Sequence, residues 1–420
     1  MRAKFIRILL LIISLFITGN LYSQNRFPKP EFESGYVQPS PTTPEPRAFQ
    51  LEYVDVIILV AVLLLTSFFI FKKRSRKGIF WTSVFSLVYF GFIRAGCICS
   101  IGAIQNVSLS LADPNYGMSI VALLFFIIPL VFALFTGRTF CAGACPLGAI
   151  QDLVIQKPIQ MSVALQRGLG MIPYLYLGLA VLYAATGTDF IICRYDPFIG
   201  IFRMDAPFAM IALGIGFLLV GLFVARPYCR FFCPYGVLLK WMSKFSRRHL
   251  TITPSECVSC KLCENSCPFD AINIPDQSIQ KRDVSKNVNR FLIFSLLIPV
   301  WMAVGVFVGH QSHVFLSKGH PQVYLAELII SHPELKNDQE NLDIQAFLQS
   351  GKSMDTLVEE ASAIRDKFKL GSWILGAFIG LVFGIRLLNQ FVYRKHEDYE
   401  PDKGDCLSCG RCMEYCPVES

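Results

Sequence analysis

Residues 256–272 read ECVSCKLCENSCPFDAI, a run of four cysteines that closes on a proline. Residues 405–417 repeat the same spacing as DCLSCGRCMEYCP. Three thiolates at this spacing wrap one corner of a cubane iron–sulfur cluster, and the fourth cysteine ligates the partner cluster in two-cluster ferredoxins. The two runs therefore predict a small α+β dicluster ferredoxin-like domain that holds two 4Fe-4S clusters.

The predicted ligands cross between the two runs. The first cluster takes Cys257, Cys260, Cys263 and Cys416, and the second takes Cys406, Cys409, Cys412 and Cys267. A pair of zinc sites is the alternative interpretation. It fits less well, because zinc motifs usually carry two CxxC pairs and not a triple run.

The composition of the 420-residue chain indicates a membrane protein. It is 53% hydrophobic and 17% charged, against about 45–50% and about 25% for soluble domains, and its mean hydropathy is +0.47. The net charge is 39 − 31 = +8, and the basic residues cluster between apolar stretches. That clustering favours membrane orientation over nucleic-acid binding. The 15 cysteines, an odd number gathered in tight runs, argue against a secreted disulfide scaffold.

Seven apolar stretches predict a polytopic membrane helix bundle, because about 20 apolar residues cross a hydrocarbon core of about 30 Å. The expected spans are 54–71, 79–93, 118–135, 169–186, 207–225, 291–309 and 370–388. The basic loop 72–77 is expected to stay in the cytoplasm. Both ferredoxin runs then lie on the cytoplasmic side of the inner (plasma) membrane, and loop 310–369, with a helix running into the last span, is periplasmic.

The remaining sequence divides around these features. Residues 1–23 have the charged start and short apolar core of a signal peptide, with an uncleaved anchor helix as the alternative. The other expected segments are a Pro-rich periplasmic linker (24–50), a membrane domain (51–249), ferredoxin half one (250–285), a span–loop–span unit (286–390) and ferredoxin half two (391–420).

A second motif, CxxxCP, occurs twice at expected cytoplasmic ends of spans. It comprises Cys141 and Cys145 in one copy and Cys229 and Cys233 in the other. Residues i and i+4 share a helical face, so the two copies together predict a four-thiolate site for iron–sulfur or zinc. Reduced structural thiols, or thiols that cap clusters of other nuclearity, are the alternatives.

These motifs resemble the NosR/NapH group of membrane polyferredoxins. The resemblance rests on TFCAGACPLGAIQDL (139–153), RPYCRFFCPYGVLLK (226–240) and the ferredoxin run, and it covers roughly 75–275 plus the C-terminal tail. It implies single-electron transfer between cytoplasmic clusters or the quinone pool and a periplasmic reductase system, most plausibly nitrous oxide reductase. Two departures from the family pattern weaken the inference of the exact partner. The linker has no room for the flavin-carrying outer domain of NosR, so no covalent FMN is expected, and an inserted unit splits the ferredoxin halves.

Three cysteines fall at expected outer ends of spans, namely Cys97, Cys99 and Cys193. The stretch from Cys99 to Gln105 echoes the stretch from Cys145 to Gln151, with CxxGAIQ common to both. Inverted repeats build matching sites on opposite membrane faces. The three cysteines are therefore candidate ligands of a further iron–sulfur centre whose fourth ligand the sequence does not identify. A disulfide and plain buried thiols are the alternatives.

Other chemistry has no support in the sequence. There is no CxxCH for covalent haem c and no nucleotide-binding motif, and no acid–base or nucleophile constellation stands apart from the cysteines. We therefore expect an electron-transfer component rather than a self-contained enzyme, with membrane lipid, redox proteins and, as a candidate, quinol as partners, and no nucleic acid. The alternative function is a maturation factor that reduces copper or thiols during metalloenzyme assembly.

Overall fold

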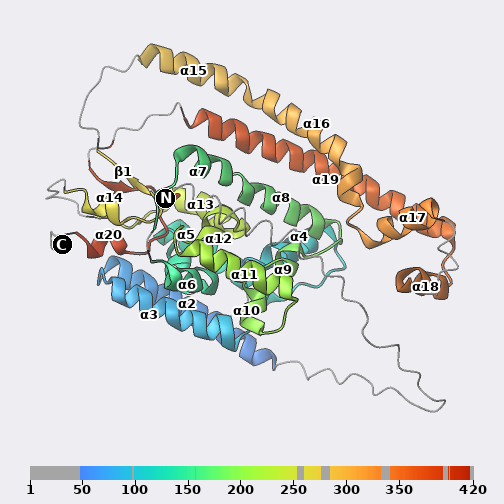
Figure 1. Cartoon of the computed structure of the whole chain (residues 1–420), viewed down its shortest axis with the longest axis horizontal. Coiled ribbons are helices and arrows are strands. Elements are labelled where there is room, and N and C mark those ends of the chain that lie inside the picture. The colour runs from blue at the N-terminus through green and yellow to red at the C-terminus, as the bar shows by residue number, and fades with distance from the viewer. Residues whose placement is uncertain are drawn as a thin grey trace. The chain divides into compact units, whose positions relative to one another are not determined.

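Helices make up almost all of the regular structure in this computed structural model (Figure 1). It describes residues 48–96, 99–156, 158–252, 260–275, 284–332, 341–390, 396 and 398–416. The expected signal peptide, nearly all of the Pro-rich linker, Cys97 and Cys257 lie outside the described residues.

The elements follow one another along the chain with short connections. In order they are α2 (Phe49–Phe71), α3 (Arg76–Ser86), η1 (Leu87–Ile93), α4 (Ala103–Ala112), α5 (Ile120–Thr136), η2 (Phe140–Ala144), α6 (Pro146–Val154), α7 (Val163–Leu169), α8 (Ile172–Ala185), α9 (Ile191–Arg194), α10 (Ile199–Arg203), α11 (Phe208–Gly221), α12 (Pro227–Phe231), α13 (Pro234–Lys244), α14 (Leu262–Ser266), β1 (Ile272–Asn273), α15 (Val284–Leu296), α16 (Ile298–Ser317), α17 (Pro321–Ser331), α18 (Leu342–Gln349), α19 (Met354–Leu388), β2 (Glu400–Pro401) and α20 (Arg411–Glu414).

The apolar stretches form the expected helices. Within the described residues, four helices are long and apolar enough to cross a membrane: Gln50–Phe71, Val163–Ala185, Arg290–Ser317 and Met354–Leu388. The apolar helices α5 and α11 are shorter. The mainly helical class with membrane-spanning candidates is confirmed, whereas the count of seven spans stays a prediction.

The membrane domain repeats one helical pattern. In one copy α3 passes into the π-helix η1, and Cys99 and α4 follow; α8 then leads into the short helices α9 and α10. In the other copy α5 leads to the π-helix η2, Cys145 and α6, and α11 then leads into α12 and α13. π-helical turns are rare and often mark functional sites. Both copies carry one shortly before a cysteine.

Helices α16 and α19 pack backbone to backbone through small residues. A Cβ added at Gly305 would lie 2.1 Å from the carbonyl oxygen of Gly376, and one added at Gly309 would lie 2.1 Å from that of Ser372. Such small-residue seams are typical of helix pairs in membranes. Helix α19 has 35 residues and so is about 52 Å long at about 1.5 Å per residue. Its polar start packs with α17 and α18 around a separate apolar core, in agreement with the predicted helix before the last span.

This helix pair returns the chain to the first ferredoxin run. Strand β1 pairs antiparallel with β2, with Ile272 opposite Pro401, and the backbone N–H of Asp402 donates to the carbonyl oxygen of Ala271 at 2.8 Å. Helix α14 packs against α20. The two runs, far apart in sequence, therefore meet in one small α+β domain.

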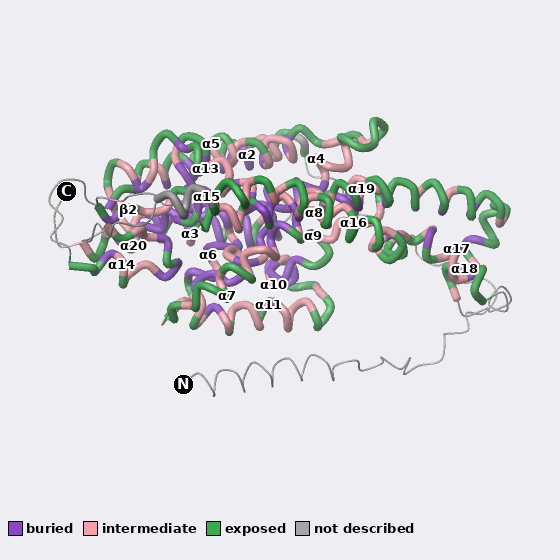
Figure 2. Tube along the Cα trace, turned by 90° about the horizontal axis from the view of Figure 1, so that it is seen from above, coloured by how far each residue is buried: buried purple, intermediate pink, exposed green. Residues whose placement is uncertain are grey.

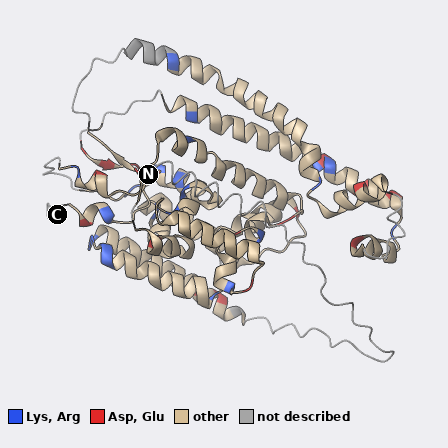
Figure 3. Cartoon of the chain, in the orientation of Figure 1, with Lys and Arg blue, Asp and Glu red and all other residues tan. Residues whose placement is uncertain are grey.

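Within Phe49–Ser420 the cysteine-bearing elements lie in a line. Figures 1 and 2 both show α14 and α20 towards one end of the long helices, α6 and α13 next, and α9 and α10 beyond them. Figure 2 also shows that buried residues concentrate around α3 and α6. Figure 3 shows basic residues, with acidic residues among them, near α14 and α20, and residues of both charges around α17.

Candidate iron–sulfur sites

The first site, here called the quartet site, consists of Cys141, Cys145, Cys229 and Cys233. Cys141 lies in η2 and Cys229 in α12, whereas Cys145 and Cys233 are the N-cap residues of α6 and α13. The proline after each capping cysteine occupies the first helical turn, a position that suits its fixed φ. The expectation that both sulfurs of a motif share one helical face is wrong, because the chain is extended at the capping cysteine.

Donors surround the quartet sulfurs. Gln151 Nε2 donates to Cys229 Sγ at 3.2 Å, and the backbone N–H of Gly236 donates to Cys233 Sγ at 3.3 Å. Arg138 Nη2 lies 3.8 Å from Cys141 Sγ. Hydrogen bonds to sulfur stabilise the thiolate over the thiol, and they also tune the potential of a bound cluster.

The four quartet thiols are close enough to influence one another. Burial raises the pKa of the Cys145 thiol well above its ordinary value, and the neighbouring sulfurs of Cys229 and Cys141 raise it further. Burial also raises the pKa of Cys229 to about 11, although the Arg226 guanidinium opposes that rise. Three buried thiols and one half-buried thiol in one place are costly to ionise unless a metal centre takes up their charge.

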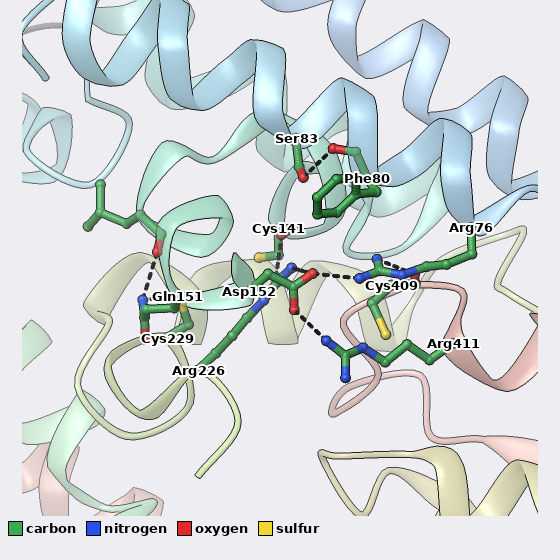
Figure 4. A network of polar contacts seen from close by, with 11 residues as sticks. Arg76, Phe80, Ser83, Cys141, Gln151, Asp152, Arg226, Cys229, Cys409 and Arg411 are labelled. Atoms are coloured by element: carbon green, nitrogen blue, oxygen red, sulfur yellow. Dashed lines mark hydrogen bonds and ion pairs between the residues drawn. The ribbon is translucent and has the colours of Figure 1, made fainter. Parts of the chain in front are cut away.

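Asp152 is the hub of an ion network beside the quartet site (Figure 4). Its Oδ2 lies 2.8 Å from Arg76 Nη2 and 3.2 Å from Arg226 Nη2, and its Oδ1 lies 3.4 Å from Arg411 Nη2. Burial alone would raise the pKa of Asp152, but attraction to Arg226, then to Arg76 and Arg411, outweighs it and holds that pKa below its usual range. The carboxylate is therefore ionised, although its side chain is 1% exposed.

Buried cations join the quartet site to the ferredoxin domain. Arg226, which is fully buried, donates to the carbonyl oxygen of Cys141 at 2.6 Å. Arg138 donates to the carbonyl oxygen of Gly404 at 3.2 Å. Arg76, from the other side, donates to the carbonyl oxygen of Cys409 at 2.8 Å. Some basic residues that the sequence indicated only as signals of membrane orientation thus also link the quartet site to the ferredoxin domain.

The second site, here called the ferredoxin site, gathers Cys267 with Cys406, Cys409 and Cys412. Burial raises the pKa of Cys406 to about 12, and Cys409 and Cys267 are the neighbouring sulfurs that raise it further. The structure thus brings Cys267, from the first run, to the three cysteines of the second run. This is the arrangement that crossed ligation requires. Ligation itself stays a prediction.

The other predicted ferredoxin ligands are less completely described. Cys260 is exposed, Cys263 is buried and Cys416 is half-buried. Cys263 lies in α14, whose neighbour α20 carries Cys412. Because Cys257 lies outside the described residues, the convergence of the first cluster's four ligands remains a prediction.

The third site, here called the companion site, contains Cys99 and Cys193. A Cβ added at Gly102 would lie 3.0 Å from Cys193 Sγ, so the Cys193 sulfur packs against the turn that follows Cys99. Burial, together with the nearby charges of Asp196 and Cys193, raises the pKa of Cys99 to about 12. Cys99 and Cys145 line the same small cavity, so the companion and quartet sites are neighbours.

The donor set suits a polynuclear cluster. A zinc ion holds its sulfur ligands at about 2.3 Å and so draws them close together. No group of three or more His, Cys, Asp or Glu side chains in the described parts of the chain is placed to hold a single metal ion. A cubane holds its four thiolate ligands farther apart. The buried thiols would ligate its irons, the N–H donors would hydrogen-bond to its sulfur ligands, and the buried arginines would offset its negative charge.

Sequence reasoning missed the residues around the sulfurs. Asp152, Arg226 and Arg138 were not singled out, and Gln151 was noted only as part of the repeated CxxGAIQ stretch. The available signal was the presence of charged residues close to cysteines at the ends of apolar stretches, where an unpaired charge would be costly.

Comparisons with known proteins agree with this chemistry. Residues 118–170 and 206–253 match one family described as a 4Fe-4S binding domain, and residues 250–273 match a second family with the same description. The chain is 28% identical over 205 residues to the uncharacterized protein MJ0750 of Methanocaldococcus jannaschii, covering 46% of this chain and 82% of that protein. No solved structure matches the chain.

Two further relatives are bacterial. The regulatory protein NosR of Stutzerimonas stutzeri is 25% identical over 263 residues, covering 56% of this chain and 36% of NosR. The putative electron transport protein YccM of Escherichia coli K12 is 26% identical over 203 residues, covering 44% of this chain and 56% of YccM. The chain thus spans about a third of NosR and about half of YccM. The chain therefore contains 4Fe-4S binding domains, is distantly related to NosR and YccM, and has helices long and apolar enough to cross a membrane.

Proposed function

We propose that this protein relays single electrons across the inner membrane, from clusters on the cytoplasmic side towards a periplasmic reductase system. The observation that carries the proposal is the linear order of three cysteine groups, from the ferredoxin site through the quartet site to the companion site. Two 4Fe-4S clusters in the ferredoxin domain and further centres at the other two groups would give a path with short steps through the about 30 Å of hydrocarbon.

The charge distribution supports this orientation. Arg76, Arg411 and Lys240 lie at the ferredoxin end, and short basic segments favour the cytoplasmic side. The α17–α18 region would then face the periplasm, and the seven expected stretches, including the shorter α5 and α11, would form the membrane part.

The residues between the sites have definable roles in the relay. A 4Fe-4S cluster supplies reversible one-electron chemistry when bound. Arg226 and Arg138 contribute buried positive charge that favours the reduced, more negative state. Asp152 holds Arg226, Arg76 and Arg411 in one network and so fixes the ferredoxin domain against the membrane domain.

The repeat also supports a docking face for a partner. Arg230, next to Cys229, holds the ferredoxin domain by donating to the carbonyl oxygen of Phe269 at 2.9 Å. Its counterpart next to Cys193 is Arg194, which is exposed and pairs with Asp189 at 2.8 Å. The position that binds the ferredoxin domain in the quartet copy is thus exposed to solvent in the companion copy. The resemblance to NosR suggests a nitrous oxide reductase system as this partner.

The relay can be tested in sealed vesicles. The full chain, purified anaerobically, is inserted into liposomes, and molecules with the ferredoxin domain outside are reduced with a membrane-impermeant low-potential reductant. An impermeant dye trapped inside should be reduced by the wild-type protein, and Cys145→Ser should abolish this reduction because it interrupts the middle of the path.

Vesicles without protein, and vesicles with the exposed-surface variant Asp205→Asn, serve as controls for leakage and insertion. A trapped dye that stays oxidised, although all cluster signals of the wild-type protein are present and bleach with the external reductant, would refute the relay.

A further inference from the structure

We propose that the companion site is a further metal centre, an iron–sulfur cluster that binds to the thiolates of Cys99 and Cys193 and to the carboxylate of Asp196. The inference builds on the proposed relay, because this centre would be its outermost step.

The sequence around Cys193 parallels that around Cys229. Each cysteine is followed by an arginine, and each segment then reaches an X–Pro step: Asp196-Pro197 in the companion copy and Cys233-Pro234 in the quartet copy. Asp196 follows Cys193 by three positions, and Cys233 follows Cys229 by four. The residue before the proline is therefore a thiolate in one copy and a carboxylate in the other.

The two copies use the same glutamine clamp. Gln151 Oε1 accepts from the backbone N–H of Tyr228, the residue before Cys229, at 3.0 Å. Gln105 Oε1 accepts from the backbone N–H of Ile192, the residue before Cys193, at 3.0 Å. Each glutamine therefore holds the start of the segment that carries the second cysteine.

Asp196 and Cys233 also share a backbone role. Cys233 Sγ accepts from the N–H of Gly236 at 3.3 Å, and Asp196 Oδ1 accepts from the N–H of Phe198 at 2.8 Å. Each side chain thus satisfies a backbone donor at the start of a helical segment. Both side chains therefore accept a backbone hydrogen bond just after their X–Pro step, although Cys233 is the N-cap of α13 and the N-cap of α10 is Phe198.

Two buried polar groups at the companion site point to a missing ligand. Asp196 is 2% exposed, and within the described residues its Oδ2 has no hydrogen-bond partner. Gln105 is 0% exposed, and its Nε2 likewise has none, whereas Gln151 Nε2 donates to Cys229 Sγ. Buried polar atoms without partners are costly and uncommon. A metal centre would satisfy both atoms, with Oδ2 as a ligand and Nε2 as a donor to sulfur.

The donor chemistry predicts the behaviour of this centre. A carboxylate is a harder ligand than a thiolate, so the iron at the Asp196 corner should be the first that the cluster loses on oxidation. Cys99 and Cys145 line one cavity, so this centre lies near the quartet site, as a further step of the relay requires.

The test uses the full chain, purified anaerobically in detergent, with iron and sulfide counting, EPR and Mössbauer spectroscopy. The double variant Cys99→Ser/Cys193→Ser should lose about four irons relative to wild type, one cubane, and keep the ferredoxin signals. Asp196→Asn retains an oxygen for the cap but removes the anionic ligand. It should lose about one iron per chain and show a three-iron cluster signal.

Asp196→Cys should retain the iron of the wild type and shift the potential and EPR spectrum of one centre only. Asp205→Asn, which changes an exposed acid after α10, should change nothing. The inference is overturned if the double cysteine variant has the iron, sulfide and spectra of wild type, if Asp196→Asn leaves every signal unchanged, or if mass spectrometry finds a Cys99–Cys193 disulfide. In each of these cases the ferredoxin clusters would still be present, whereas a wild-type protein devoid of iron would refute the proposed function itself.

Discussion

The quartet site and the companion site share a backbone scaffold and differ in charge. Both have a π-helical turn, an X–Pro step after the second cysteine and a glutamine that holds the second cysteine segment. Beside its glutamine, however, the quartet copy has Asp152, paired with three arginines, and the companion copy has Asn106, which accepts a hydrogen bond from Tyr116 Oη at 2.7 Å. The comparison teaches that the scaffold sets where the sulfurs lie, and that side chains outside the scaffold set the electrostatics of each centre.

The balance of buried charge differs between the two sites. Among the described residues, the quartet site has two buried arginines, Arg226 and Arg138, against one buried acid, Asp152, whereas the companion site has the buried acid Asp196. A cation stabilises the more negative reduced state of a cluster, and a carboxylate destabilises it. The repeat thus offers two similar positions at which reduction has different free energies.

Asp152→Asn is expected to have the largest effect, because it gives the quartet copy the same residue type that the companion copy has at Asn106. Arg226 would lose its buried partner, and unpairing a buried ion pair costs about 3–5 kcal/mol. We expect a clearly lower midpoint of thermal unfolding in detergent and loss of ferredoxin-cluster signals as the domain detaches. Asn106→Asp is the matched exchange in the other copy. If Asp152→Asn unfolds at the wild-type temperature, the network does not hold the domains together.

The same carboxylate gives a pH dependence with a defined sign. The folded-state pKa of Asp152 lies below its usual range, so its contribution to stability is complete above the unfolded pKa of about 3.9. The contribution is lost as the pH falls through the lower folded value. Unfolding midpoints of wild type and Asp152→Asn should therefore converge only in strong acid, and a difference that disappears near neutral pH would contradict this assignment.

Gln151 and Gln105, which hold the second cysteine segment of each copy, are expected to contribute differently to the free energy of unfolding. Gln151→Leu removes contacts to the Leu147 carbonyl oxygen, Cys229 Sγ and the Tyr228 N–H, and should cost about 2–3 kcal/mol, because a buried donor is left unpaired. Gln105→Leu also removes an Nε2 that has no partner in the described residues, so its cost in metal-free protein should be smaller, about 1–2 kcal/mol. Thermal unfolding measures both, and equal costs in metal-free protein would argue against the difference.

Much of the fold was predictable from hydrophobic length and cysteine spacing. The apolar stretches are helical, and the meeting of the two ferredoxin runs follows from an even number of crossings between them. The CxxGAIQ repeat, visible in the amino-acid sequence, also pointed to related sites. These features depend on local sequence, which a single chain displays directly.

The surroundings of the sulfurs were harder to predict. Whether Arg226 is buried or lipid-facing depends on Asp152, 74 positions away in the sequence, and on the fold that joins them. The π-helical turns η1 and η2 have no simple periodic signature. Asp196 escaped attention because an aspartate before proline is an ordinary turn residue, and only its burial and its parallel with Cys233 distinguish it.

Substitution of Arg138 has the smallest expected effect, and it tests only the electrostatic difference between the quartet and companion sites. Its Nη2 approaches Cys141 Sγ at 3.8 Å and its Nη1 donates to the Gly404 carbonyl oxygen, so it lies between the quartet and ferredoxin sites. Arg138→Gln should lower the potential of the quartet centre by tens of millivolts, since about 1.4 kcal/mol corresponds to about 59 mV for one electron. Arg138→Lys keeps the charge and should restore most of that potential. Redox titration followed by EPR measures both variants, and the companion centre should keep its wild-type potential. A shift of equal size at both centres would mean that the copies sense one common field, and that the charges beside each scaffold do not set its potential separately.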